Sequence, residues 1–347
     1  MLNAKENMRE VIRGGNPDRY VNQFEALQFF SSPFSRMHGS YIRKGQMGVK
    51  NAWGVTINYP ENVPGSFPDH SPDKIVVKDI EDWKDYVKAP SLYFSYELWE
   101  EYAAMYESAD NSKSFNTLLW APGVFEQTHY LCSMTDVLCY CITNPNEVKD
   151  LVKYLIDWEL KFAEGICAHL HPEAIFHHDD WGSETNSFMS PAMFEEYFLE
   201  GYKELYAYYH NHGVELIIHH SDSYGANLMP SMIEMGIDVW QGCIQTNNVY
   251  DLVAKYGSQI TFMGNIDNKL VDFEDWTIEN CHNIARKVLD NAPLRGFIPC
   301  ITQGGPGSVY KGTYMGLVEG INIVNEEKFG FTKSQQDEHR QPMTVFG

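Results

Sequence analysis

A pair of histidines and an aspartate follow an apolar run in the second half of the chain. His219, His220 and Asp222 come directly after residues 216–218, which read Leu-Ile-Ile and predict a buried strand. Because side chains alternate between the two faces of a strand, we expect His220 and Asp222 on one side and His219 on the other. Imidazole and carboxylate on one side can bind a metal ion, or act as a base and its orienting group. The plainer interpretation is an outward-packing histidine beside a hydrogen-bonded one, but the adjoining aspartate favours a functional role.

A second cluster of the same kind lies at residues 177–180, which read His-His-Asp-Asp and follow another apolar run. Alternation places His178 and Asp180 on one side, and we predict both, with His220, as catalytic groups. Two carboxylates and two imidazoles cannot all be desolvated as ions, so this strand end should open into a wet cleft. The alternative is a turn in which Asp179 or Asp180 caps backbone N–H groups.

Cys300 ends a further apolar run and precedes a glycine-rich loop that includes Gly304, Gly305 and Pro306. Alone, such a thiol is more often a buried apolar group than a metal ligand. Together with His220 and Asp222 it would give three zinc ligands, which is the number that a catalytic zinc takes while leaving one position open. The loop could let the backbone approach a bulky cofactor or a phosphate, but it lacks the Gly-Lys-Ser/Thr of a P-loop.

Other polar side chains also follow predicted strands, where they could bind a polar ligand or cap the next helix. Glu126 follows the strand at 115–120 and is a further candidate for the site. The residues predicted to bind substrate or cofactor are Glu126, Asp179, His219, Gln241, Asn265, Asp267, Gly304 and Gly305.

Hydrophobic periodicity places these residues on an alternating series of strands and helices. We expect strands at 20–24, 115–120, 174–178, 214–219, 238–240, 260–263 and 297–299, and helices at 4–13, 96–108, 146–169, 191–212, 226–235, 249–256, 275–291 and 313–326. Strands that alternate with long helices predict a parallel sheet. Nearly every predicted strand is followed by polar residues that could do chemistry. In a TIM barrel the C-terminal ends of all strands meet at one mouth, so this pattern favours an α/β TIM (β/α)8 barrel over an open sheet. The eighth strand has no clear counterpart in the sequence.

The predicted domain is single and spans residues 1–347, with a regular barrel part at 111–347. The first part, 1–110, is irregular, and we expect it to cover the barrel mouth as a lid. Aromatic residues there could supply an apolar lining, although more of them should belong to the core: Phe24, Phe29, Phe30, Phe34, Tyr41, Trp53, Tyr59 and Phe67.

Composition excludes several classes of protein. The formal charge of -21 argues against a nucleic-acid partner, which needs a basic surface, and is otherwise a solubility feature or a means of steering a cationic ligand. No apolar run is long enough to span a membrane, and the charged opening stretch lacks a signal-peptide core, so we expect a cytoplasmic protein. The seven cysteines contain no Cys-x-x-Cys pair and indicate free thiols.

The order of these motifs resembles the uroporphyrinogen decarboxylase superfamily. The similarity covers most of the chain and is firmest from about residue 115 to 326. It rests on Ser190-Pro191-x-x-Phe194 opening a helix, the strand ending His220-x-Asp222, the run 264–267 reading Gly-Asn-Ile-Asp, and the strand ending in Cys300. The fold that this resemblance implies is a TIM barrel.

The chain departs from the decarboxylase itself at the N-terminal stretch that holds substrate propionates with arginines. The comparable region, 30–37, reads Phe-Ser-Ser-Pro-Phe-Ser-Arg-Met, and an aspartate-rich mouth suits a polycarboxylate poorly. The resemblance therefore points to the corrinoid-dependent methyltransferase branch. That branch binds zinc through His-x-Cys and a later Cys, which here correspond to His220, Asp222 and Cys300. Asp222 replaces a cysteine, and a carboxylate gives a harder metal, suited to an oxygen or nitrogen leaving group rather than a thiol.

The resemblance implies a zinc-dependent methyltransferase that demethylates a small O-methyl ether, aromatic or not, and passes the methyl group to cob(I)alamin on a separate corrinoid protein. Its expected setting is anaerobic one-carbon metabolism, with a homodimer as the predicted assembly and no nucleic-acid or membrane partner. Three alternatives stay open: transfer from a methyl-corrinoid to a thiol or folate, a metal-free decarboxylase or lyase with an Asp/His acid–base pair, and a non-catalytic ligand-binding barrel.

Overall fold

The central element is a seven-stranded parallel sheet in which the strand order follows the chain, β1-β5-β6-β7-β8-β9-β10. The computed structural model describes residues 1–38, 42–61, 63, 65–305 and 307–341. All six pairings between these strands are parallel, as in a TIM-like barrel. The strands are β1 (Leu27–Phe30), β5 (Phe115–Trp120), β6 (Ala174–His178), β7 (Leu216–His220), β8 (Val239–Cys243), β9 (Thr261–Ile266) and β10 (Phe297–Ile301).

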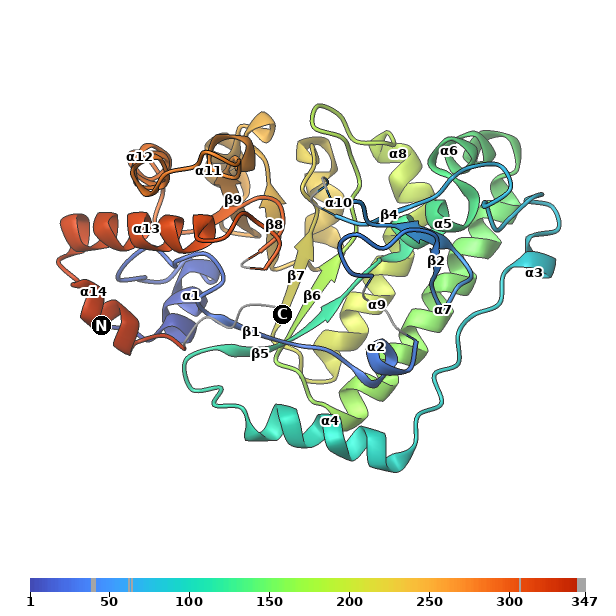
Figure 1. Ribbon diagram of the computed structural model, residues 1–347, viewed down its shortest axis with the longest axis horizontal. Coiled ribbons are helices and arrows are strands. Elements are labelled where there is room, and N and C mark those ends of the chain that lie inside the picture. Colours follow the sequence, from blue (N-terminus) through green and yellow to red (C-terminus); the bar gives the residue numbers. More distant parts are fainter. Residues whose placement is uncertain (39–41, 62, 64, 306, 342–347) are drawn as a thin grey trace.

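Helices cover the sheet, with α4, α7 and α9 on one side of the central strands and α11, α12 and α13 on the other (Figure 1). The helices are α1 (Ala4–Ile12), α2 (Pro33–His38), α3 (Trp83–Tyr86), α4 (Tyr96–Ser108), α5 (Val124–Cys132), α6 (Met134–Thr143), α7 (Pro145–His169), α8 (Pro191–Phe194), α9 (Glu200–Asn211), α10 (Met229–Glu234), α11 (Val249–Tyr256), α12 (Ile278–Leu289), α13 (Thr313–Phe329) and α14 (Lys333–Glu338). A π-helical segment, Glu195–Leu199, joins α8 to α9.

The α/β class and the parallel sheet agree with the sequence prediction, and the six strands predicted from residue 115 onward are present within a few residues. The Ser190–Pro191 helix start is also confirmed, because the Ser190 hydroxyl accepts a hydrogen bond from the N–H of Met193 at 3.2 Å. The helix ends before Gly213, which has a left-handed φ of 99°.

The strand predicted at 20–24 is wrong, and the N-terminal strand of the sheet is β1, at Leu27–Phe30. The segment 20–24 does lie against β10, where the Gln23 N–H donates to the carbonyl of Pro299 at 3.2 Å. Gln23 has a φ of 53°, which breaks extended pairing, and Pro299 has no N–H to return a ladder bond. The described residues therefore contain seven barrel strands rather than eight, with an irregular segment between β10 and β1.

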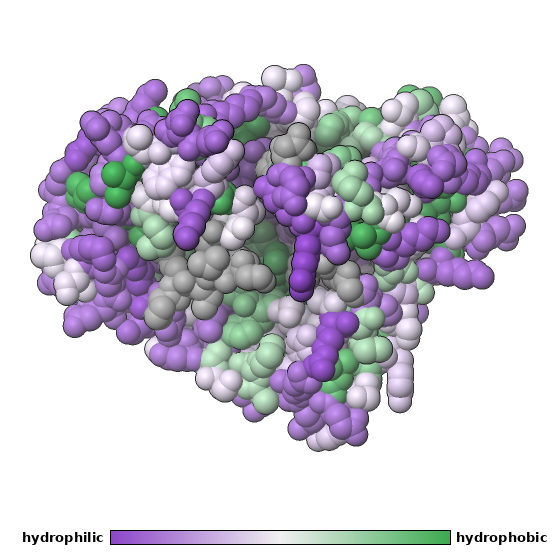
Figure 2. Space-filling view, viewed as in Figure 1, coloured by the Kyte–Doolittle hydropathy of each residue, from purple (hydrophilic) through white to green (hydrophobic). Residues whose placement is uncertain are grey.

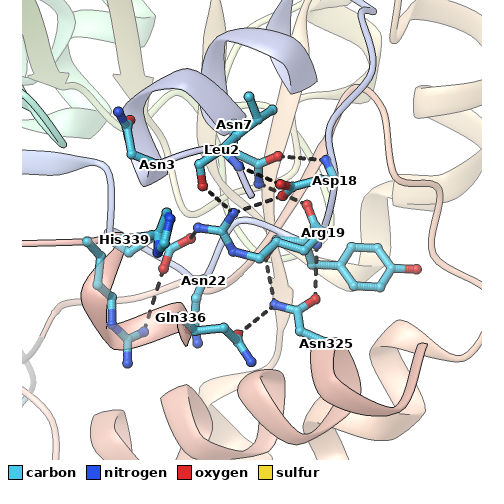
Figure 3. Close-up of polar contacts among 12 residues, drawn as sticks. Leu2, Asn3, Asn7, Asp18, Arg19, Asn22, Asn325, Gln336 and His339 are labelled. Carbon is cyan, nitrogen blue, oxygen red and sulfur yellow. Dashed lines mark hydrogen bonds and ion pairs between the residues drawn. The ribbon is translucent and has the colours of Figure 1, made fainter. Parts of the chain in front are cut away.

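A buried polar cluster around Arg19 joins this seam to both ends of the described chain (Figure 3). Arg19 is fully buried, and its Nη1 donates to the carbonyl of Leu2 at 3.0 Å and to Asp18 at 2.9 Å. The side chain of Asn325, on α13, accepts from the N–H of Tyr20 at 3.0 Å and donates to the Tyr20 carbonyl at 2.9 Å. Tyr20 is thus fixed to the last long helix, and Arg19 next to it is fixed to the start of the chain.

The N-terminal part contains more than loops. It supplies β1 to the main sheet and forms a small antiparallel sheet of β2 (Val49–Lys50), β3 (Thr56–Asn58) and β4 (Phe67–Pro68). Its predicted role as a lid over the mouth stays a prediction. Tyr41 and Pro306, which were named among the predicted lid and loop residues, lie outside the described residues.

The surface fits the acidic composition. Hydrophilic residues cover most of the face in Figure 2, and more hydrophobic ones show in a recess near its centre. Within the described residues, no helix has the length and hydropathy needed to cross a bilayer. All seven cysteines are free thiols, as predicted.

One glycine lets two strand ends of the barrel approach each other closely. Gly242 lies on β8 with a φ of 91°, and a Cβ there would fall 2.8 Å from the carbonyl oxygen of Ser221. Gly236 has a similar φ of 86°, but a Cβ there would meet open space. Alanine substitutions at these two glycines therefore separate the free-energy cost of a left-handed backbone from the free-energy cost of a steric clash.

We predict that Gly242→Ala lowers the free energy of unfolding by about 1–3 kcal/mol more than Gly236→Ala, because both variants strain φ but only the first overpacks the barrel. Urea unfolding of both variants and the parent protein measures the difference. Equal losses would show that β7 and β8 are not in close contact here.

Candidate active site

The ends of the barrel strands enclose a cavity of about 390 Å³. Its wall comes from β1, β5, β6, β7 and β8, from α5, and from loops at the N-terminal and C-terminal parts of the chain. The lining residues are Phe24, Phe29, Gly65, Ser66, Leu119, Glu126, Tyr130, Phe176, His178, Asp180, His220, Asp222, Gln241, Gln303, Gly304 and Gly305.

Strand alternation decides which of the histidines and aspartates reach this cavity. His178 and Asp180 line it from the end of β6, and His220 and Asp222 line it from the end of β7. The intervening residues His177, Asp179 and His219 are fully buried on the other face of the strands. The two pairs also lie side by side, because His178 is in register with His220.

Three of these side chains form a group that could hold a metal ion. The ligand atoms of His178, Asp180 and His220 all lie within 4.8 Å of one another. The two imidazole rings are stacked, with their centroids 4.4 Å apart and their planes 24° from parallel. Two imidazoles and one carboxylate match the ligand number of a catalytic zinc site with an open position.

Gln241 fixes the protonation pattern of His220. The Gln241 Nε2 donates to the carbonyl of Ile301 at 3.1 Å, so its Oε1 is the atom that faces Nδ1 of His220. An amide oxygen accepts only, so Nδ1 of His220 carries the hydrogen and Nε2 offers a lone pair. Burial lowers the pKa of His220 to about 4, and this keeps the ring neutral, as a metal ligand must be.

Glu126 plays the equivalent part for His178, because its carboxylate lies 2.8 Å from Nδ1 of that ring. Burial acts to lower the pKa of His178, but the charges of Glu126, Asp180 and Asp222 outweigh it and raise the pKa to about 10. The pKa of Glu126 is raised, mainly by burial. A carboxylate on Nδ1 leaves Nε2 for a metal, which would displace the proton there.

Asp179 holds the helix that carries Glu126. Its carboxylate accepts from the backbone N–H groups of Phe125 at 3.0 Å and Glu126 at 2.8 Å, and from the hydroxyl of Tyr202. These N–H groups belong to the first turn of α5 and have no partner within the helix. The approach requires a glycine at 123, where a Cβ would lie 2.5 Å from the Asp179 side chain. Asp179 is therefore a structural anchor of the site rather than part of its wall.

His219 is likewise placed behind the wall. Its Nε2 lies 3.1 Å from the carbonyl of Asp179, and its Nδ1 lies 2.9 Å from the Tyr206 hydroxyl. That hydroxyl also contacts His177, which pairs with Glu159 at 2.6 Å. The chain of polar contacts satisfies these buried groups beneath the site.

Asp222 and Cys300, the other two predicted metal ligands, differ in their access to the cavity. Asp222 lines it, and burial, together with the charge of Asp180, raises its pKa to about 8. Cys300 is fully buried and is not among the described lining residues. Its thiol lies 3.9 Å from Nε2 of Gln241, on the far side of that amide from the histidines.

The remaining predicted binding residues fall into two groups. Gln241, Gly304 and Gly305 line the main cavity. Asn265 lines a separate cavity beside α11 and α12, and Asp267 lines a third, polar cavity of about 260 Å³ that shares Asp222 and Gln303 with the main one. Sequence analysis did not identify Tyr130 or Gln303 as lining residues. Tyr130 follows Glu126 by one helical turn, a spacing that could have placed it at the site.

Comparisons with known proteins bear on this site. The family model of uroporphyrinogen decarboxylase (URO-D) matches residues 42–299. Among solved structures, a methyltransferase from Methanosarcina mazei is similar with a TM-score of 0.63 and 11% identity, over 93% of this chain and 99% of that one. A sugar phosphate isomerase/epimerase from Parabacteroides distasonis has a TM-score of 0.33 and 10% identity, over 71% of this chain and 81% of that one, too low to carry an argument. No curated protein sequence matches the chain. The M. mazei likeness supports the fold.

Two fully buried tyrosines on α9 allow a test of the Asp179 anchor. The Tyr202 hydroxyl donates to Asp179, whereas the Tyr209 hydroxyl has no hydrogen-bond partner among the described residues. We predict that Tyr202→Phe lowers the free energy of unfolding by about 1–3 kcal/mol, because it removes a donor from a buried carboxylate. Tyr209→Phe, the matched control, should change it by less than about 0.5 kcal/mol.

Chemical denaturation of the two variants measures both values. If Tyr209→Phe were as costly as Tyr202→Phe, loss of the hydroxyl's packing would explain the effect, and the anchoring role of Tyr202 would be rejected.

Proposed function

The chain belongs to the uroporphyrinogen decarboxylase (URO-D) family, and we propose that within this family it is a zinc-dependent methyltransferase of a corrinoid system. In this proposal it demethylates a small O-methyl ether and passes the methyl group to cob(I)alamin on a separate corrinoid protein. The observation that carries the proposal is the group formed by His178, Asp180 and His220 at the floor of the cavity.

The donor set of this group fits zinc. Both rings are held through Nδ1, by Glu126 and by Gln241, so that both Nε2 atoms are available on the cavity side. Such outer partners are typical of histidines that bind zinc, since they fix the ring and raise its basicity. We propose His178, Asp180 and His220 as the ligands. The set predicted from the family resemblance, His220, Asp222 and Cys300, shares one member with it.

A zinc ion held there would supply Lewis acidity toward the ether oxygen. The side chains supply the proton that the departing oxygen needs. The predicted proton donors His178 and Asp180 are metal ligands in this assignment, so another group has to carry the proton. Asp222 lines the same cavity next to Asp180. Burial, together with the charge of Asp180, raises the pKa of Asp222 to about 8, so its carboxyl is the group that would donate a proton to the departing atom.

The transfer balances without an added oxidant. The methyl carbon forms a bond to the cobalt of cob(I)alamin, the carbon–oxygen bond breaks, and the oxygen keeps the electron pair and takes up one proton. The corrinoid protein would have to dock at the barrel mouth, since the cavity of about 390 Å³ is too small to enclose a corrin ring.

The ligand assignment predicts which variants lose metal. His178→Ala, Asp180→Asn and His220→Ala should each reduce bound zinc at least about tenfold, because a three-ligand site does not survive on two. Cys300→Ala should retain zinc, as should Cys243→Ala, a matched control for a fully buried thiol at the end of another strand of the sheet, β8.

Zinc content of the purified variants, measured by mass spectrometry, checks this. Loss of zinc from Cys300→Ala and Asp222→Asn, with retention in His178→Ala and Asp180→Asn, would replace this ligand set with the one predicted from the resemblance.

Metal removal tests the activity itself. Chelation should lower demethylation at least about a hundredfold in an assay with reduced corrinoid protein, and added zinc should restore it, because the Lewis acid contributes several kcal/mol to the leaving of oxygen. Unchanged activity after chelation would favour a metal-free decarboxylase or lyase. Tight ligand binding without turnover would favour a non-catalytic barrel, and methylation of a thiol or folate by methyl-corrinoid would reverse the direction.

A further inference from the structure

The main cavity has two chemically unlike halves. One half is aromatic: Phe24, Phe29 and Phe176 meet edge to face, with ring centroids 5.8 Å apart for Phe24 and Phe29 and 5.3 Å apart for Phe29 and Phe176. Phe176 in turn stacks on His220 with centroids 5.7 Å apart, so the aromatic wall leads directly to the candidate metal ligands. An aromatic ring is the ligand group that such a wall accommodates best.

The other half is acidic and lacks a cationic anchor. Glu126, Asp180 and Asp222 line it, and no lysine or arginine is among the described lining residues. A divalent ion held by His178, Asp180 and His220 would be balanced inside the cavity by the carboxylates of Asp180 and Glu126, so it would leave no spare positive charge for a ligand. The imidazole of His178 is already paired with Glu126.

Among the described residues that line it, the adjoining polar cavity offers no free cation either. It shares Asp222 and Gln303 with the main cavity, and its lysine, Lys269, is paired with Glu184 at 2.6 Å. A carboxylate on a ligand in the main cavity would therefore be desolvated beside like charges with no partner, which is among the costliest arrangements in a protein.

We infer that the cavity selects an uncharged aromatic ring over a carboxylated one, so that the methyl donor is an aryl methyl ether without an acidic substituent. That the bound ring donates a methyl group rests on the proposed function, whereas the charge selectivity rests on the cavity alone. The volume of about 390 Å³, at the small end for organic ligand sites, suits a single ring with short substituents.

A set of nearly isosteric ligands tests the inference on the zinc-loaded protein. para-Methoxybenzyl alcohol is neutral, para-methoxybenzoate is an anion and para-methoxybenzylamine is a cation at neutral pH. We expect calorimetry to show the alcohol binding at least about tenfold more tightly than the benzoate, because only the benzoate places an unpaired charge in the acidic half. Equal or tighter binding of the benzoate would overturn the inference. The amine brings a positive charge to the same carboxylates, so it should bind at least as tightly as the alcohol, and weaker binding of the amine would also count against the inference.

A cation added at the cavity rim should reverse part of the selectivity. Ser66 is exposed and lines the cavity, so it tolerates a longer side chain. Ser66→Lys should strengthen benzoate binding about threefold or more and leave the alcohol nearly unchanged, since it supplies the missing counter-charge. Ser66→Gln, of similar length but uncharged, is the matched control. Equal effects of the two variants on the benzoate would count against the electrostatic explanation.

The binding experiment needs no corrinoid protein, so it fails independently of the proposed function. Preference for the alcohol without demethylation in the complete assay would support the selectivity of the cavity and reject the methyltransferase. Demethylation of the benzoate as fast as of the alcohol would retain the methyltransferase and reject the selection against an acidic substituent.

Discussion

The arrangement of the site depends on one buried carboxylate. Asp179 accepts two backbone N–H groups at the start of α5 and a tyrosine hydroxyl, and it thereby fixes a helix to the end of β6. Because α5 is held there, Glu126 reaches His178 at 2.8 Å and leaves the other ring nitrogen for the cavity. Gly123 belongs to the same constraint, since any side chain at that position would occupy the space of Asp179.

Beside this anchor, strand alternation divides the side chains of β6 and β7 strictly between two faces. His178 and His220 face the cavity, while His177 and His219 lie behind it, in a chain of hydrogen bonds that ends at Glu159. A buried imidazole needs a partner for each ring nitrogen, and Tyr206 provides one for both rear rings. The two adjacent histidines on each strand thus have different roles: His177 and His219 stabilise the wall from behind, and His178 and His220 face the cavity.

The sequence allowed prediction of the features that are local. Strand alternation was enough to pair His178 with Asp180 and His220 with Asp222, and polar residues at strand ends indicated a barrel. The partners of the two rings were not predictable as partners, because the contact of His220 with Gln241 depends on the register of β7 and β8, and that of His178 with Glu126 on the docking of α5. The wrong strand prediction at 20–24 has the same cause. Continued strand pairing there would need an N–H from Pro299, which has none and is distant in sequence. Cys300 was placed at the correct strand end, but whether a thiol there reaches the cavity depends on the Gln241 amide in front of it.

The Arg19 cluster has a consequence for how the protein is made. Tyr20 is held by Asn325, 305 positions later, so the segment between β10 and β1 acquires its full set of hydrogen bonds only when α13 is present. During synthesis, one edge of β1 therefore stays unpaired until nearly the whole chain has emerged from the ribosome. Contacts this distant slow folding and expose aggregation-prone edges in the meantime.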